Sequence, residues 1–138
     1  MIVLDEQLLG YGLQDAIATW YRGVVTDITQ LRPRSRVLDD AIPSLLRTVR
    51  YPTFVTINVA DFWRRIAPDK RSAILCFDLP DPRARDISLL LRRLLRHKEF
   101  RTRRARMGKI ARIAATHAHY YTNDSWAIRT IDWPRSRR

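Results

Sequence analysis

Residues 2–5 read IVLD and residues 53–57 read TFVTI, with Asn58 directly after the second stretch. The first stretch is an apolar run that ends in a carboxylate, and the second is rich in β-branched and aromatic residues. Both patterns indicate buried strands, and AILCF at residues 73–77 indicates a third. Polar side chains therefore follow the ends of two expected strands.

Helical patterns alternate with these strands. Apolar side chains recur at helical spacing from Leu9 to Trp20 and from Ile42 to Val49, and residues 87–95 carry the clearest amphipathic pattern. Other expected elements are strands at residues 24–28 and 126–133, a short helix at residues 61–66 and a strand-turn-strand unit at residues 109–122. This alternation predicts an α/β sandwich with a mostly parallel sheet and a small antiparallel addition at its end.

The chain has 138 residues, of which 46% are hydrophobic and 29% are charged. This length and composition indicate one globular domain, residues 1–138, with an α/β core at residues 1–97 and a basic extension at residues 98–138. No apolar run approaches the roughly 18–20 residues of a transmembrane helix. Residues 1–9 lack the basic and apolar regions of a secretory signal. We therefore expect a cytoplasmic protein without a membrane partner.

The net charge of +12 arises in the C-terminal part of the chain. Residues 1–82 contain 10 basic and 10 acidic side chains, whereas residues 83–138 contain 16 basic and 4 acidic ones, an excess of 12. This asymmetry indicates a surface for a polyanion, for which nucleic acid is the expected partner. A solvated basic face, or one that meets an acidic protein, is the alternative. The densest basic cluster is Arg101, Arg103, Arg104, Arg106, Lys109 and Arg112.

Acidic side chains follow the expected strands or begin helices. Asp5 and Glu6 end the strand at residues 2–5, and Asn58 and Asp61 follow the strand at residues 53–57. Asp39 begins the second helix. In an open parallel sheet, ligands bind outside the carboxyl ends of the strands. Two carboxylates ~4 Å apart repel by about 4 kcal/mol at an effective dielectric of 20, so a cluster of them requires a cation. Oxygen ligands favour Mg²⁺ or Mn²⁺, which support hydrolysis of a phosphodiester.

The stretches IVLDEQLL, VLDDAI and FVTINVADF, in this order, resemble the small bacterial PIN-like domains of the DUF5615 group, which are allied to the Mut7-C PIN-like domains. The resemblance covers residues 1–97. It implies a Rossmann-like α/β/α sandwich and, for active members, a Mg²⁺- or Mn²⁺-dependent ribonuclease, in many cases the toxin of a toxin–antitoxin pair. RNA is the implied substrate, and an antitoxin protein and a second copy of the chain are further candidate partners.

The resemblance also implies roles for individual residues. Asp5, Asp39 and Asp61 would hold one or two ions, with Glu6 as a ligand or a neighbour of one, and Asn58 would orient a metal-bound water. The chain departs from the family pattern at Asn58, which stands where an aspartate is expected, and one extra residue separates it from Asp61. An asparagine ligates through its amide oxygen but cannot act as a base.

Alternatives remain open from the residues alone. Helix capping would also explain Asp39 and Asp61. The loss of a carboxylate at Asn58 favours a PIN-like module that binds RNA or an acidic protein without cleavage. A protein-interaction subunit, held by a cognate antitoxin, is the third alternative.

Overall fold

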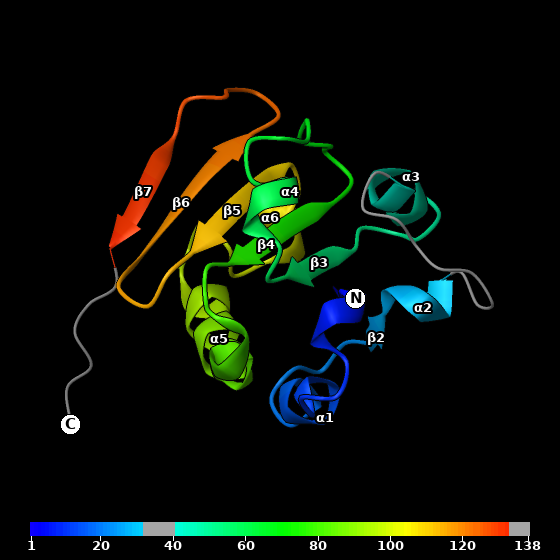
Figure 1. Cartoon of the computed structure of the whole chain (residues 1–138). Helices are drawn as coiled ribbons and strands as arrows, with labels where there is room; N and C mark the ends of the chain where they lie inside the picture. Colours follow the sequence, from blue (N-terminus) through cyan, green and yellow to red (C-terminus); the bar gives the residue numbers. More distant parts are fainter. Residues whose placement is uncertain (32–40, 133–138) are drawn as a thin grey trace.

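A mixed β-sheet runs through the centre of the protein (Figure 1). This computed structural model describes residues 1–31 and 41–132, apart from the side chains of residues 81 and 82. Within those residues the sheet has seven strands, β1 (Ile2–Leu4), β2 (Val25–Asp27), β3 (Thr53–Thr56), β4 (Ala73–Phe77), β5 (Lys109–Ile113), β6 (His117–Thr122) and β7 (Arg129–Asp132). Their order across the sheet is β2-β1-β3-β4-β5-β6-β7.

The strands from β2 across to β5 are parallel, and β6 and β7 are added in the antiparallel direction. This confirms the mostly parallel sheet and the antiparallel addition that the sequence predicts. Leu4 of β1 pairs with Asp27 of β2 on one side and with Val55 of β3 on the other. The strand order therefore reverses at β1. Ligands of open parallel sheets bind at such a reversal, outside the carboxyl ends of the strands.

Helices cover both faces of the sheet (Figure 1). One face packs against α1 (Leu13–Ala18) and α5 (Ile87–Arg96), and the other against α2 (Ile28–Leu31), α3 (Ile42–Leu46) and α4 (Val59–Phe62). The described part of the chain also contains η1 (Glu6–Leu8), η3 (Asp81–Asp86) and α6 (Arg103–Arg106). Each face has its own apolar cluster, so the layers form an α/β/α sandwich.

The α5 helix illustrates how the amphipathic pattern produces this packing. Its side chains at Ile87, Leu91 and Leu94 are fully buried against the sheet and α1. At the contact between α1 and α5, Trp20 Nε1 donates a hydrogen bond to Ser88 Oγ at 3.0 Å. Among residues 1–31 and 41–132, no helix combines the length and apolar character needed to cross a lipid bilayer.

Several elements have other bounds than the sequence predicts, and in two of them a polar side chain that bonds to the backbone is the reason. The strand expected at residues 24–28 ends at Asp27, whose carboxylate accepts a hydrogen bond from Thr29 N at 2.9 Å and so starts α2. The helix expected at residues 61–66 is α4, which begins earlier because Asn58 caps its first turn.

Arg106, one of the six basic residues assigned to nucleic acid, is part of the fold. Its side chain is buried, Nε donates to Thr53 Oγ1 at 3.2 Å, and Nη1 donates to the carbonyl oxygens of Phe100 at 3.0 Å and Arg101 at 3.3 Å. Burial lowers the pKa of Arg106, and the charge of Arg103 lowers it further. The guanidinium group therefore holds α6 against the amino end of β3.

Replacing Arg106 separates this structural role from that of its exposed neighbour Arg104. We expect Arg106→Met to lower the free energy of unfolding by about 2–4 kcal/mol, because buried acceptors lose their donor. Arg104→Met should change it by less than about 0.5 kcal/mol, because that side chain is exposed. Urea denaturation of both variants checks this, and two equally small effects would contradict the assignment.

Candidate functional site

The carboxyl ends of β1 and β3 place Asp5 and Thr56 side by side. Asp5 N donates to Val55 O at 2.9 Å, which continues the ladder one residue beyond β1. Thr56 Oγ1 then donates to Asp5 Oδ2 at 2.6 Å. Asp5 is 3% exposed and Thr56 is 0% exposed. The site therefore starts from a buried carboxylate that is oriented by a hydroxyl group on the neighbouring strand.

Asn58 connects this pair to Asp61. Its backbone N donates to Thr56 Oγ1 at 2.9 Å, and its side-chain Nδ2 donates to Asp61 Oδ2 at 2.8 Å. In the other direction, Asp61 N donates to Asn58 Oδ1 at 3.1 Å. One hydrogen-bonded chain thus runs from Asp5 through Thr56 and Asn58 to Asp61, and we call these four residues the β1–β3 polar cluster.

Burial makes the charged form of Asp5 unfavourable. It raises the pKa of the Asp5 carboxyl above its ordinary value of 3.8, and the negative charge of Glu6 acts in the same direction. The hydrogen bond from Thr56 and the nearby backbone N–H groups of Glu6 and Gln7 oppose the rise without cancelling it. A cation beside Asp5 would offset the cost of ionisation. Buried carboxyl groups with such shifts gather at functional sites.

The sequence-predicted acids do not all fall within this cluster. Hydrogen bonds connect Asp5, through Thr56, to Asn58 and Asp61. The Glu6 side chain is exposed on η1, one residue after Asp5. Asp39 lies outside the described residues.

Asp27 is a further carboxylate at this edge that the sequence interpretation missed. It ends β2 and is 7% exposed. It pairs with Leu4 rather than Asp5, so the alternation of side chains directs it to the opposite face of the sheet. The signal was present in the sequence, because Asp27 ends an apolar strand in the same way as Asp5 does.

The donor chemistry of the β1–β3 polar cluster fits a hard cation. Asp5 and Asp61 supply carboxylate oxygens, and Mg²⁺ sites in proteins commonly use one or two carboxylates together with water and substrate phosphates. In the part of the chain that the structure describes, no group of three or more His, Cys, Asp or Glu side chains is placed to hold a metal ion. The cluster therefore suits an ion whose coordination shell is completed by substrate. It suits an ion enclosed by protein ligands less well.

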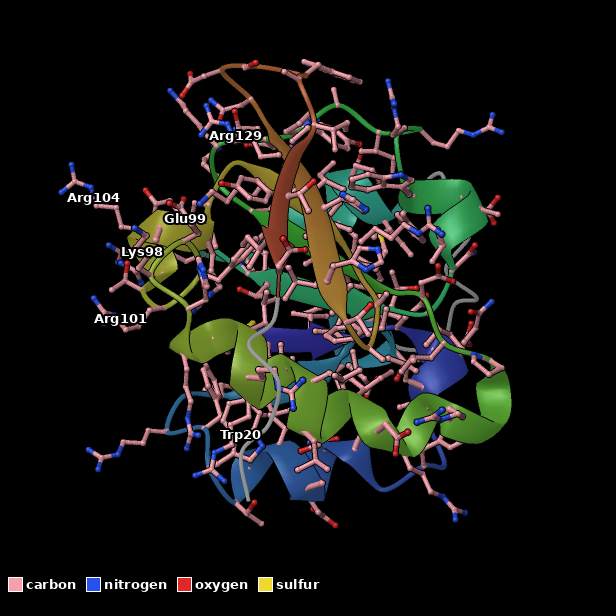
Figure 2. The ribbon with its side chains drawn as sticks, turned by 90° about the vertical axis from the view of Figure 1, so that its left-hand side faces the viewer. Trp20, Lys98, Glu99, Arg101, Arg104 and Arg129 are labelled. Atoms are coloured by element: carbon pink, nitrogen blue, oxygen red, sulfur yellow. The ribbon has the colours of Figure 1, made fainter. Side chains whose placement is uncertain are left out.

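The six basic residues of the predicted nucleic-acid surface do not share one surface. Arg101, Arg103 and Arg104 are exposed, and Figure 2 shows Arg101 and Arg104 projecting from the same side of the molecule. Arg106 is buried, as described above. Arg112 pairs with the carboxylate of Asp78, Nε to Oδ2, at 3.0 Å.

Lys109 is also committed to an internal contact. Its Nζ donates to the carbonyl oxygen of Glu99 at 2.6 Å and to the Glu99 carboxylate at 3.2 Å, and it lies over the rings of Phe100 and Tyr120. The bond from Lys109 holds the pKa of the Glu99 carboxyl below its ordinary value. The side chain of Lys109, like that of Arg106, is therefore held by hydrogen bonds within the fold.

The acidic and basic features lie at opposite edges of the sheet. The β1–β3 polar cluster follows the carboxyl ends of β1 and β3. The α6 helix lies at the other edge, because Arg106 bonds to Thr53, the first residue of β3.

Comparisons of this chain with family models, curated proteins and solved structures find no match.

The stability of an Asp5→Asn variant tests the buried charge. Since the folded protein binds the Asp5 proton more tightly than the unfolded chain, ionisation costs stability as the pH rises from 3.8 through the folded-state pKa. The variant cannot ionise, so its melting temperature relative to the parent should rise over this window and then level off. Thermal unfolding between about pH 3 and pH 8 measures the difference, and parallel curves would contradict it.

Removing the hydroxyl group of Thr56 tests the bond that orients Asp5. We expect Thr56→Val to lower the free energy of unfolding at neutral pH by about 1–3 kcal/mol, because a buried carboxylate loses its donor at nearly constant side-chain volume. Thr19→Val is the matched control, since the Thr19 hydroxyl bonds locally in an exposed position. Urea denaturation measures both losses. Equal losses in the two variants would show that the Asp5–Thr56 bond contributes no more to the free energy of unfolding than an exposed local bond does.

Proposed function

We propose that the β1–β3 polar cluster is the centre of a PIN-like, Mg²⁺- or Mn²⁺-dependent ribonuclease. The observation that carries the proposal is Asp5, a buried carboxylate with a raised pKa at the point where the strand order reverses. Its hydrogen-bonded connection to Asp61 gathers two carboxylates from distant parts of the sequence. The resemblance of the sequence to PIN-like domains supplies the reaction, hydrolysis of an RNA phosphodiester.

In this proposal Asp5 and Asp61 hold the ion, with Asp39 as the third ligand that the resemblance implies. When bound, the ion lowers the pKa of a water molecule and neutralises charge that develops on the phosphate. Thr56 donates to one oxygen of Asp5 and so fixes the orientation of the carboxylate. Asn58 does the same for Asp61 through its side-chain amide. A neutral amide cannot accept a proton, so Asn58 positions a ligand and does not serve as a base.

The biological setting comes from the resemblance alone. A ribonuclease of this type would act in the cytoplasm on cellular RNA, and a toxin would be held inactive by an antitoxin protein. A second copy of the chain stays a candidate partner.

Cleavage of RNA in Mn²⁺ tests the proposal. We expect slow metal-dependent cleavage of a labelled single-stranded RNA that EDTA abolishes. Asp5→Asn and Asp61→Asn should each reduce the rate on the order of 100-fold or more, because each removes a charged ligand. Asp15→Asn, which removes one exposed carboxylate from α1, should leave the rate unchanged. Cleavage that survives Asp5→Asn would reject the site.

One observation favours a second function, RNA binding without cleavage. The side chain that follows β3 is the amide of Asn58, whose Nδ2 donates to the Asp61 carboxylate at 2.8 Å and whose Oδ1 accepts from the Asp61 backbone N at 3.1 Å. A cluster with this amide attracts a cation less strongly than one with a third carboxylate. The same assay separates the two functions, since the binding module retains RNA in Mn²⁺ and releases no cleaved product.

A further inference from the structure

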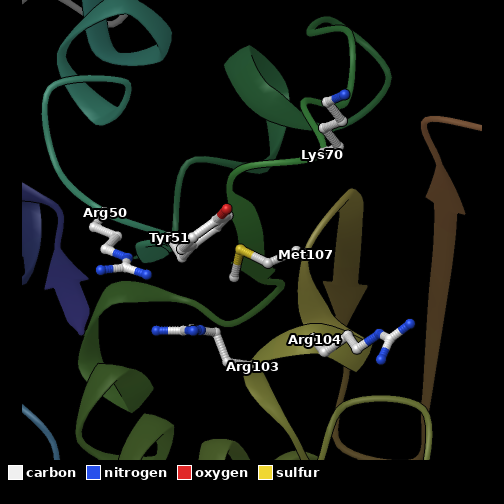
Figure 3. A pocket seen from close by; sticks show the side chains of 6 residues that line it. All are labelled: Arg50, Tyr51, Lys70, Arg103, Arg104 and Met107. Atoms are coloured by element: carbon white, nitrogen blue, oxygen red, sulfur yellow. The ribbon is translucent and has the colours of Figure 1, made fainter.

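A basic pocket lies at the edge of the sheet opposite the β1–β3 polar cluster. Figure 3 shows the side chains that line it. Its volume is about 390 Å³. It is lined by four cations, one aromatic ring and one thioether, from Arg50, Tyr51, Lys70, Arg103, Arg104 and Met107. The sequence interpretation named two of these residues, Arg103 and Arg104, and missed the others because they come from three separate segments.

The parallel topology explains why these segments meet. Tyr51 precedes β3, Lys70 precedes β4 and Met107 precedes β5. These three strands are adjacent and parallel, so the segments before them emerge at the same edge of the sheet. Arg106 fixes the α6 helix beside them through its bond to Thr53. The buried arginine thus positions the exposed ones.

The cations of the pocket are not neutralised within the described part of the chain. There, Arg50, Lys70, Arg103 and Arg104 form no ion pair, and all four side chains are exposed. Uncompensated charge gathered in a concave surface attracts anions.

Tyr51 organises two of the arginines. Its φ of 51° lies in the left-handed region, which is unfavourable for a bulky residue and marks a position where strain is retained. The guanidinium carbon of Arg103 lies 4.9 Å from the centre of the Tyr51 ring, and that of Arg50 lies 5.8 Å from it. Stacked guanidinium groups keep their N–H edges available for phosphate oxygens.

The cations are spread along the surface instead of converging on one point. Figure 3 shows Arg103 extending toward Tyr51 and Arg50, whereas Arg104 extends in the other direction. A second pocket, of about 480 Å³, shares Arg50 and Tyr51 and is also lined by Arg47 and Arg71, both of which pair with Asp69. Such an arrangement suits successive phosphates of a chain better than one isolated phosphate.

We propose that this pocket binds single-stranded nucleic acid, with backbone phosphates on Arg50, Lys70, Arg103 and Arg104 and a base packed against Tyr51 and Met107. Positive grooves with aromatic side chains are the common design for single strands. The inference locates the RNA contact of the proposed function, but it does not depend on cleavage. RNA and DNA share the recognised groups.

Binding in EDTA tests the pocket without involving the metal centre. The probe is a fluorescein-labelled oligouridylate of about 12 nucleotides, followed by fluorescence anisotropy over a series of salt concentrations. The double variant Arg50→Gln, Arg103→Gln should weaken binding on the order of tenfold and make the slope of log affinity against log salt shallower by about 1.4, that is about 0.7 for each lost contact. The matched control is Arg92→Gln, Arg93→Gln, which removes two exposed charges from α5.

Four further arms complete the test. Tyr51→Leu should weaken binding by about fivefold or more, because a base loses its aromatic surface. Asp15→Asn, on α1 and outside both sites, should bind with unchanged affinity. Because EDTA removes the metal, failure of the ribonuclease proposal and failure of this one are distinguishable. An oligothymidylate of equal length should bind within a few-fold of the RNA if the backbone dominates, and uridine monophosphate should compete only weakly.

Three results would contradict the proposal. Equal weakening in the α5 control would show that diffuse charge, and not the pocket, binds the strand. Competition by uridine monophosphate at the affinity of the oligonucleotide would show a single-phosphate site. Circular dichroism of each variant must match the parent, and photo-crosslinking of thiouridine-labelled RNA should map to Tyr51 in the unmodified protein; crosslinks confined to other segments would overturn the proposal.

Discussion

The hydrogen bond from Thr56 to Asp5 joins the two halves of the site. The two residues are 51 positions apart in the sequence, and only the parallel pairing of β1 with β3 brings them together. The bond orients a carboxylate that burial makes costly to ionise, and it offsets part of that cost. The same Thr56 hydroxyl accepts the N–H of Asn58, which in turn fixes Asp61. The arrangement of the cluster therefore depends on the register of this one strand pair.

The fold was largely predictable because its signals are local. The apolar runs at residues 2–5 and 73–77 are typical of buried strands, and the pattern at residues 87–95 places its apolar side chains on one helix face. Element ends were less predictable, since they depend on side-chain bonds such as that from Thr29 N to Asp27. The order of the strands, which decides where the site lies, is a long-range property that one sequence does not display.

The sequence pointed to the acids of the cluster more clearly than to the bases of the pocket. Asp5 directly follows β1, and Asn58, two residues after β3, caps the α4 helix that carries Asp61. The basic cluster was read as one surface because its members are close in sequence, but Arg106 and Lys109 point into the protein and bond there. Two of the exposed arginines, Arg103 and Arg104, instead join Arg50 and Lys70 at the opposite edge of the sheet. Proximity in sequence could not separate charges that hold the fold from charges that face a ligand.

We propose that Asp5 and Asp61 bind a divalent cation together. Titration of Mn²⁺ into an isotope-labelled sample, followed by paramagnetic broadening of backbone amide signals, tests it most directly. We expect the signals of residues 4–6 and 58–61 to broaden first and together, and Asp5→Asn to remove the effect at both segments. Broadening that begins at other carboxylates, such as Asp69 or Glu99, or that persists at residues 58–61 in the Asp5→Asn variant, would contradict it.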